Sequence, residues 1–284
     1  MAGVSMKDIK LRIRSMESTK QIPKAMEMVA ASKLRRAQDR VQKSRPYFEV
    51  LYQAVTDIGT SHRDVSSPYL DKRQIQKSCY VVIAGDRGLA GGYNHNILKL
   101  AEEEMHGKDA VVLPVGKKAL EYFRAHGHQI LFDAYDEAAA LSISDCFTMA
   151  RSICKAFLDG QFDEVCLAYT NFASILVQTP SVLPLLPLPR PEPSEKGEAS
   201  QRLTCYEPSG EAVFNTIIPE YLGGLIYGAL CESIASEQGA RRTAMDAATK
   251  NAEDMIDDLS LKYNRARQGA ITQEITEIVA GADA

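Results

Sequence analysis

The residues most suggestive of chemistry form the glycine-rich segment GDRGLAGGYN at 85–94, which follows a short apolar run. A glycine loop between a strand and a helix can bind phosphate, because its backbone N–H groups point at the anion. Here the glycines stand at positions 85, 88, 91 and 92, so the dinucleotide spacing GxGxxG is missing. Gly116-Lys117-Lys118 likewise lacks the Ser or Thr that ends a Walker motif. The spacing favours a tight strand-to-helix turn with an exposed Asp86-Arg87 pair over a nucleotide site.

Thiol and metal chemistry are not indicated either. The six cysteines have no CxxC spacing and no neighbouring histidines, so we expect no zinc site and free thiols in a reducing compartment; they are Cys79, Cys146, Cys154, Cys166, Cys205 and Cys231. Cys79 and Cys166 fall in predicted strands, where a cysteine is usually part of the core. His126 and His128 flank Gly127 in a predicted turn. We therefore predict no catalytic residue, no cofactor and no metal.

Composition narrows the class of protein. With 284 residues, 45% of them hydrophobic and 25% charged, the chain is expected to be soluble and folded. No apolar run reaches the ~18 residues that a membrane span requires, and the polar N-terminus does not resemble a secretory signal. A membrane-spanning or secreted protein is therefore not predicted.

The net charge of −4 hides a division between the two ends of the chain. Residues 1–45 hold 12 Lys and Arg against four Asp and Glu, a balance of +8, whereas residues 211–284 hold six against 12, a balance of −6. Opposite charges favour pairing of the two segments, although each exposed ion pair contributes little. The basic segment also leaves open a surface for nucleic acid or for an acidic protein partner.

The C-terminal run from about 211 to 284 has the pattern of a coiled coil. Its apolar residues recur at alternating steps of three and four: Met245, Ala248, Ala252, Met255 and Leu259. A single helix over 211–278 would be roughly 100 Å long, which exceeds the diameter of a domain of this size. The helix must therefore pack against another segment, and Ile271, Ile275 and Ile278 near its end predict contact with a partner.

Residues 1–59 are predicted to form the other long helix. Its apolar residues form a first stripe of Ile9, Ile13 and Met16 and a second of Ile22, Met26, Ala30, Leu34, Ala37 and Val41. The register changes between the two stripes, around Lys20 and Pro23, where the proline should kink or interrupt the helix. Since neither terminal helix can bury its stripe alone, we expect the two to pair antiparallel.

The segment between them, 60–210, has the pattern of an α/β domain. Short β-rich runs at 78–84, 110–115, 128–132 and 164–170 alternate with helical stretches near 93–106, 117–125 and 142–158. This alternation predicts a mostly parallel sheet covered on both faces. Residues 174–185 are expected to add an antiparallel edge strand, and 188–200 an exposed loop. The predicted fold class is α/β: a long antiparallel coiled coil of the terminal helices 1–59 and 211–284, with an inserted Rossmann-like α/β domain.

Three segments together resemble the gamma subunit of the F-type ATP synthase, and the resemblance covers the whole chain. The family's N-terminal helix is similar to MKDIKLRIRSMESTKQIPKAMEMVAASKLRRAQ at 6–38, the loop of its α/β domain to GDRGLAGGYN, and its C-terminal signature to KYNRARQGAITQEITEIVAGA. Gln21 and Pro23 depart from the family pattern, in which lysine and threonine are common. The regulatory dithiol insertion of chloroplast members is absent, so redox control is not expected. The chain resembles the bacterial members.

The resemblance implies a non-catalytic rotor, present in one copy per complex. Its coiled coil would stand inside a ring of three alpha and three beta subunits, and its α/β domain would contact the epsilon subunit and the c-ring. Proton flow would turn the c-ring and the shaft, and rotation would change the conformation of the catalytic beta subunits. The resemblance further implies a peripheral protein on the cytoplasmic face of the cell membrane that binds no nucleic acid.

The resemblance also implies contacts with a beta subunit. Positions that match family residues hydrogen-bonding a beta-subunit loop are Arg267, Gln268, Thr272 and Glu274. Met26 matches a shaft position close to an acidic segment of the beta subunit, and the basic residues Lys33, Arg35 and Arg36 could meet the same acidic surface.

Two other functions stay open from the residues alone. A nucleotide-binding α/β enzyme would use the central domain, although the glycine spacing speaks against it. A nucleic-acid-binding coiled coil would use the basic N-terminal helix, although its aromatic residues are few and cluster around 47–52, where they cannot offer stacking platforms along the helix.

Overall fold

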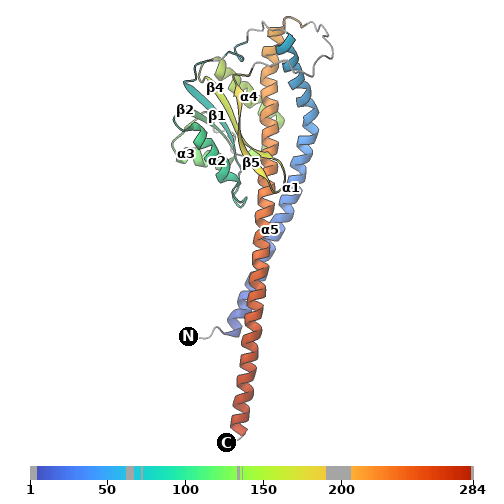
Figure 1. Ribbon diagram of the computed structural model, residues 1–284, viewed down its shortest axis with the longest axis vertical. Coiled ribbons are helices and arrows are strands. Elements are labelled where there is room, and N and C mark those ends of the chain that lie inside the picture. The colour runs from blue at the N-terminus through green and yellow to red at the C-terminus, as the bar shows by residue number, and fades with distance from the viewer. Residues whose placement is uncertain are drawn as a thin grey trace. The chain divides into compact units, whose positions relative to one another are not determined.

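The computed structural model describes residues 5–61, 67–71, 73–132, 135, 137–189 and 206–282. Its elements, in chain order, are α1 (Met6–Ser61), β1 (Lys77–Ile83), α2 (Tyr93–Met105), β2 (Asp109–Val115), α3 (Lys117–Ala125), β3 (Gln129–Ile130), the 3-10 turn η1 (Ala138–Ala140), α4 (Ile143–Leu158), β4 (Glu164–Phe172), β5 (Gln178–Leu186) and α5 (Gly210–Ala282) (Figure 1). The chain divides into two compact units, one of Met1–Ala31 with Arg241–Ala284 and the other of Ser32–Ala240. The predicted fold class, a pair of long terminal helices with an inserted α/β domain, is confirmed.

The sheet has five strands in the order β3-β2-β1-β4-β5. β1 runs parallel to β2 and β4, and β2 runs parallel to β3, whereas β5 pairs antiparallel with β4. β5 is the predicted edge strand, where its prolines Pro180 and Pro184 can be accommodated without a second neighbouring strand. The third strand is shorter than predicted, because it pairs with β2 only at Gln129 and Ile130.

Helices cover both faces of the sheet, as the sequence predicts. Successive side chains of a strand point to opposite faces. On one face Tyr80 and Val82 of β1 pack with residues of α2 and α3. On the other face Val81 of β1 belongs to a larger core formed with α4, the end of α1 and the start of α5.

The terminal helices pair antiparallel in each unit. In the unit that contains the sheet, the rings of Phe48 and Tyr227 lie 6.2 Å apart and those of Tyr52 and Tyr221 lie 6.4 Å apart. In the other unit Lys20 Nζ lies 3.4 Å from Glu253 Oε1, and the Glu27 and Arg242 side chains approach to 3.8 Å. Because rising numbers on α1 meet falling numbers on α5 in both, the predicted pairing is confirmed.

The first helix is not interrupted at Pro23, and the kink that was the alternative expectation there stays a prediction. α1 is helical from Met6 to Ser61 and so continues through both Pro23 and Pro46. A proline removes one helical hydrogen bond. Most helix stability in proteins comes from tertiary packing of the apolar face, which here exceeds that local loss.

The buried seam differs from the predicted one at several positions. Met245 and Ala252 are buried as expected, but Met255 is 54% exposed. Met255 borders a hollow of about 320 Å³ whose α1 side is formed by Arg12, Ser15 and Met16, so the seam is not closed by apolar side chains at this position. On α1, Ala30 and Leu34 are buried whereas Ile22 is 63% exposed, which corrects the predicted stripe at its first position.

Candidate interaction surface

The glycine-rich loop at 85–94 is a strand-to-helix turn closed by its own polar groups. The backbone N–H of Gly85 donates to Asn94 Oδ1 at 2.8 Å, and the Asn94 amide donates to the carbonyl of Arg87 at 3.2 Å. The Asp86 carboxylate accepts from the backbone N–H groups of Ala138 and Ala139 at 2.8 and 3.1 Å. Asp86 is therefore half-buried rather than exposed as predicted, while Arg87 is exposed. These groups are engaged with protein atoms, which disfavours a phosphate site here.

The cysteines of the described chain belong to the core. Cys79, Cys146, Cys154, Cys166 and Cys231 are buried and not disulfide-bonded. Burial raises the pKa of the Cys79 and Cys166 thiols to about 12. A thiol acts as a nucleophile or metal ligand in its thiolate form, which burial suppresses at neutral pH. Cys205 and most of the predicted loop at 188–200 lie outside the described residues.

The two histidines of the 126–128 turn have local partners. The His126 ring stacks on Tyr122 with centroids 4.0 Å apart, and His128 Nε2 lies 3.1 Å from Glu102 Oε2. Among the residues that the structure describes, no three His, Cys, Asp or Glu side chains gather into a group able to hold a metal ion. Within those same residues, no helix is both long and apolar enough to cross a bilayer.

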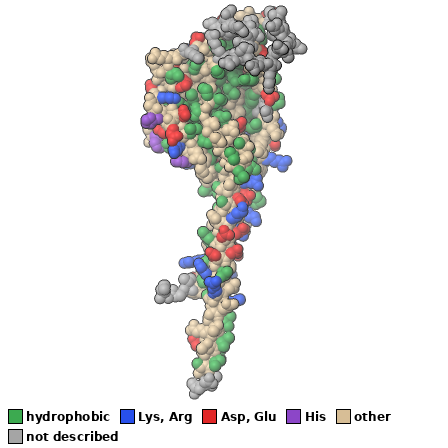
Figure 2. All heavy atoms as spheres, viewed as in Figure 1, with side chains coloured by type: hydrophobic (Ala, Val, Ile, Leu, Met, Phe, Trp, Pro, Cys, Tyr) green, Lys and Arg blue, Asp and Glu red, His purple; other side chains and the backbone are tan. Residues whose placement is uncertain are grey.

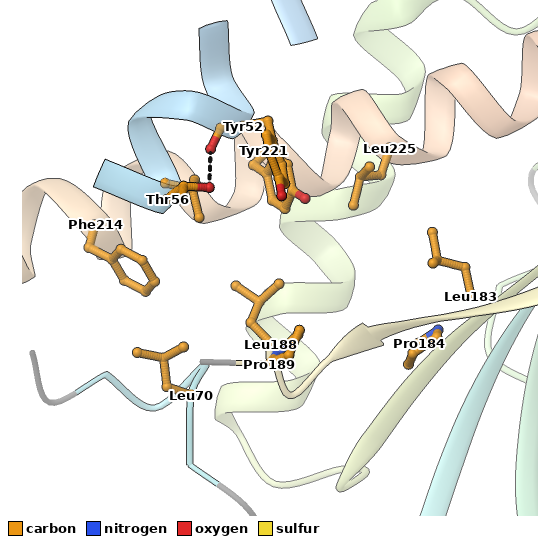
Figure 3. A pocket seen from close by; sticks show the side chains of 11 residues that line it. Tyr52, Thr56, Leu70, Leu183, Pro184, Leu188, Pro189, Phe214, Tyr221 and Leu225 are labelled. Carbon is orange, nitrogen blue, oxygen red and sulfur yellow. Dashed lines mark hydrogen bonds between the residues drawn. The ribbon is translucent and has the colours of Figure 1, made fainter. Parts of the chain in front are cut away.

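An apolar hollow of about 400 Å³ lies beside α1, α5 and β5 (Figure 3). It is lined by Tyr52, Val55, Thr56, Leu70, Leu183, Pro184, Leu188, Pro189, Phe214, Tyr221 and Leu225. The Thr56 hydroxyl donates to the carbonyl of Tyr52 at 2.8 Å, and burial raises the pKa of the Tyr221 hydroxyl. Because this lining carries no carboxylate, imidazole, thiol or amine, it offers no acid or base that would exchange protons near neutral pH.

The polar residues proposed near the C-terminus form an exposed stretch of α5. Arg267, Gln268, Thr272 and Glu274 are all exposed, and the Thr272 hydroxyl donates to the carbonyl of Gln268 at 2.9 Å. Three isoleucines alternate with them and are 47%, 56% and 71% exposed, at Ile271, Ile275 and Ile278. Figure 2 shows hydrophobic side chains along one side of this end of the helix. Exposed apolar side chains interleaved with hydrogen-bonding groups are suited to binding a protein.

The proposed residues of α1 differ among themselves in exposure. Met26 is half-buried, whereas Lys33, Arg35 and Arg36 are exposed. Met26 belongs to the same compact unit as the 267–274 stretch, and the three basic residues belong to the other unit. Sequence reasoning missed two apolar residues that follow Met26, Met28 at 63% and Val29 at 55% exposure. Because both are apolar and lie outside the predicted apolar stripe, the sequence already indicated that they would be exposed.

Glu232 of α5 gives a prediction about pH. Its Oε2 atom is buried with no hydrogen-bond partner in the described part of the chain. Burial raises the pKa of Glu232, and a hydrogen bond from the backbone N–H of Phe172 only partly opposes the shift. The folded state therefore holds the proton more tightly than the unfolded state, and this stabilisation is lost as pH rises from the ordinary value of 4.5 through the raised pKa.

We expect Glu232→Gln to raise the free energy of unfolding by about 1 kcal/mol at pH 8, because the amide removes an uncompensated buried charge. The gain should largely disappear at pH 4, below the ordinary pKa of 4.5, where the wild-type carboxyl is mostly protonated in both states. Urea unfolding at the two pH values measures the difference, with Glu211→Gln on an exposed position of the same helix as the control. A gain of equal size at both pH values would contradict this account.

A family model described as ATP synthase matches residues 5–284. The chain is 45% identical over 279 residues to the ATP synthase gamma chain of Ruminococcus albus, covering 96% of each chain. It is 40% identical over 297 residues to the sodium-ion-specific ATP synthase gamma chain of Acetobacterium woodii, covering 99% of this chain and 98% of that one.

Solved structures are similar in fold. A chain of the Euglena gracilis mitochondrial ATP synthase (OSCP/F1/c-ring) has a TM-score of 0.61 at 20% identity, with 98% of this chain and 94% of that chain covered. A chain of the Tetrahymena thermophila central stalk and c-ring has a TM-score of 0.60 at 23% identity, with 80% and 99% covered. At these identities the likeness concerns the fold.

Proposed function

Because this chain belongs to the ATP synthase gamma-chain family, we propose that it is the central rotor shaft in the F1 sector of a proton-translocating ATP synthase. The observation that carries the proposal is the match of the whole chain to relatives that are named gamma chains. The chain is a non-catalytic subunit, and ATP is made on the beta subunits of the complex. Its α/β part supplies structure, with a glycine-rich loop whose polar groups bond to protein.

The shaft acts by making unequal contacts. One asymmetric chain inside a ring of three alpha and three beta subunits cannot touch the three beta subunits alike. Each beta subunit then favours a different conformation, and as the shaft rotates each beta subunit adopts these conformations in turn. The antiparallel pairing of α1 and α5 supports this role, because two paired helices can transmit torque between the ring of alpha and beta subunits and the α/β domain.

The other partners are the epsilon subunit and the c-ring, which the α/β domain contacts. In this proposal residues 1–59 and 211–284 form the coiled coil and 60–210 form the α/β domain with its flanking loops. The protein is peripheral, attached to the membrane through the complex, and the cytoplasmic face of the cell membrane is the proposed location.

The beta-subunit contacts are proposed at the exposed C-terminal stretch. Arg267, Gln268, Thr272 and Glu274 would hydrogen-bond a beta-subunit loop, and their exposure supports this role. Met26 and the basic residues Lys33, Arg35 and Arg36 would face the acidic segment of the beta subunit. Charge complementarity at such positions affects the rate and specificity of association more than the affinity.

Co-purification with separately expressed alpha and beta subunits tests the proposal. We expect a stable complex with one copy of this chain per six ring subunits, and ATP hydrolysis by that complex. A chain truncated after Leu259 should leave the ring roughly tenfold faster, since it lacks the polar and apolar contacts of the terminal stretch. A chain truncated after Val279 is the matched control and should behave as the full chain does. Failure to form a complex at any salt or nucleotide concentration would overturn the proposed function.

A further inference from the structure

The face of α5 that meets the ends of β1 and β4 contains a row of buried polar side chains. Ser233, Ser236 and Glu237 are 1%, 0% and 5% exposed; we name these three residues the polar seam. A helix that covers a sheet usually presents an apolar stripe, and Asp, Glu and Ser are mostly exposed. Elsewhere on the same helix that rule holds, since Phe214, Ile218 and Leu222 are buried in the core.

The two serines bind both backbone groups of one strand residue. The backbone N–H of Thr170 donates to Ser233 Oγ at 3.1 Å, and the Ser236 hydroxyl donates to the Thr170 carbonyl at 3.2 Å. β1 pairs with β4 only as far as Ala168, two residues before Thr170. At this position α5 thus supplies hydrogen bonds of the kind that a neighbouring strand would make.

Glu237 is in close contact with the glycine-rich loop. A Cβ atom on Gly85 would lie 2.9 Å from Glu237 Cδ, so a side chain at this position would displace the carboxylate. Gly85 is itself fixed, because its N–H donates to Asn94 and its carbonyl accepts from the backbone N–H of Lys118 at 3.0 Å. The glycine-rich loop, which was a candidate phosphate-binding site in the sequence, is therefore a contact surface for α5.

Directional contacts resist rotation in a way that apolar contacts do not. Apolar attraction is proportional to buried area and has no preferred direction, whereas a hydrogen bond weakens steeply as its angle departs from linearity. Turning α5 about its own axis would break both bonds to Thr170 while sacrificing only part of the apolar packing.

Building on the proposed function, we propose that the polar seam is the torsional joint that fixes α5 to the sheet when torque passes between the α/β domain and the helix. Ser233, Ser236 and Glu237 are positioning residues in this joint. They bind no substrate and act by limiting how far the sheet turns relative to the helix.

A single-molecule measurement on the assembled complex tests the joint. The alpha–beta ring is fixed to a surface, a gold rod is attached to the α/β domain, and the width of its angular fluctuation is recorded while the enzyme waits for ATP. The double variant Ser233→Ala/Ser236→Ala should increase the angular variance roughly twofold, because the directional contacts to Thr170 are gone. The rate of ATP hydrolysis at low load should be unchanged, since the seam is not at a catalytic site.

Two further variants keep the result interpretable. Gly85→Ala, which pushes Glu237 away, should widen the distribution in the same direction. Thr216→Ala removes a hydroxyl that bonds within α5 itself, to the Ala212 carbonyl, and should leave the variance unchanged. If the double variant does not assemble, the single variant Ser233→Ala is measured in its place, because it keeps the hydrogen bond from Ser236 to Thr170.

Unchanged variance in assembled complexes of the serine and Gly85 variants would overturn the joint while leaving the rotor function intact. Failure of the wild-type chain to assemble with the ring would instead count against the proposed function.

Discussion

Replacing Gly116 with alanine is expected to remove about 4 kcal/mol of stability from the α/β domain, the sum of a backbone term and a steric term. Gly116 separates β2 from α3 with φ +96° and ψ 145°, a conformation that is essentially restricted to glycine. An added Cβ would also lie 2.2 Å from the carbonyl oxygen of Ala84, and a backbone atom held by the sheet cannot move away. Typical domains are stable by only 5–15 kcal/mol.

Thermal unfolding of the full chain, followed by circular dichroism, measures the effect of Gly116→Ala. Gly160→Ala is the matched control, because Gly160 has φ +73° with no atom within 4 Å of an added Cβ. The control carries the left-handed backbone cost alone, about 1–2 kcal/mol. If the two variants lose equal stability, the contact with Ala84 is not the cause.

Gly223→Ala should destabilise the chain by about 2 kcal/mol, although alanine is the better helix former. Gly223 lies within α5, and its added Cβ would fall 2.3 Å from Phe147 Cδ1 and 3.1 Å from Phe147 Cα. The second distance is to the backbone of α4, so rotation of the Phe147 ring alone cannot relieve the contact. The glycine permits the close approach of α4 and α5.

Gly228→Ala on the same helix should have the opposite sign. No atom lies within 4 Å of a Cβ at this position. The variant should therefore gain roughly 0.5–1 kcal/mol, because alanine loses less backbone entropy than glycine on folding. Urea unfolding of the two variants beside the wild type gives the comparison. Stabilisation by both substitutions would show that α4 and α5 are less closely packed at Gly223.

The elements of the α/β domain could be predicted from sequence because their signals are local. Periodicity and turn residues place β1, α3 and β4 within one or two residues of their predicted ends, and prolines identify β5 as the edge strand. The antiparallel pairing of α1 and α5 could be predicted because each has an apolar stripe that it cannot bury alone. The family followed from three segments that are specific in combination.

The errors concern features that depend on what a residue meets across the fold. Pro23 was expected to kink or interrupt α1, and the helix is not interrupted there, because packing along it outweighs one lost hydrogen bond. Met255 has the seam spacing yet is exposed, because it borders a hollow between α1 and α5 instead of a closed apolar seam. Asp86 was expected to be exposed, but it binds backbone groups more than 50 residues away in the chain.

The sequence by itself determined the fold class, the pairing of the terminal helices, the family and the mismatch of the glycine loop with nucleotide motifs. Tertiary structure alone decided what that loop does, which helical glycines permit close contacts, and why α5 carries polar residues on a buried face. The division has a physical reason: periodicity is a property of neighbouring residues. The hydrogen bonds of Thr170 to Ser233 and Ser236, and the close packing of Glu237 against Gly85, require segments that are distant in the chain to meet with a particular geometry.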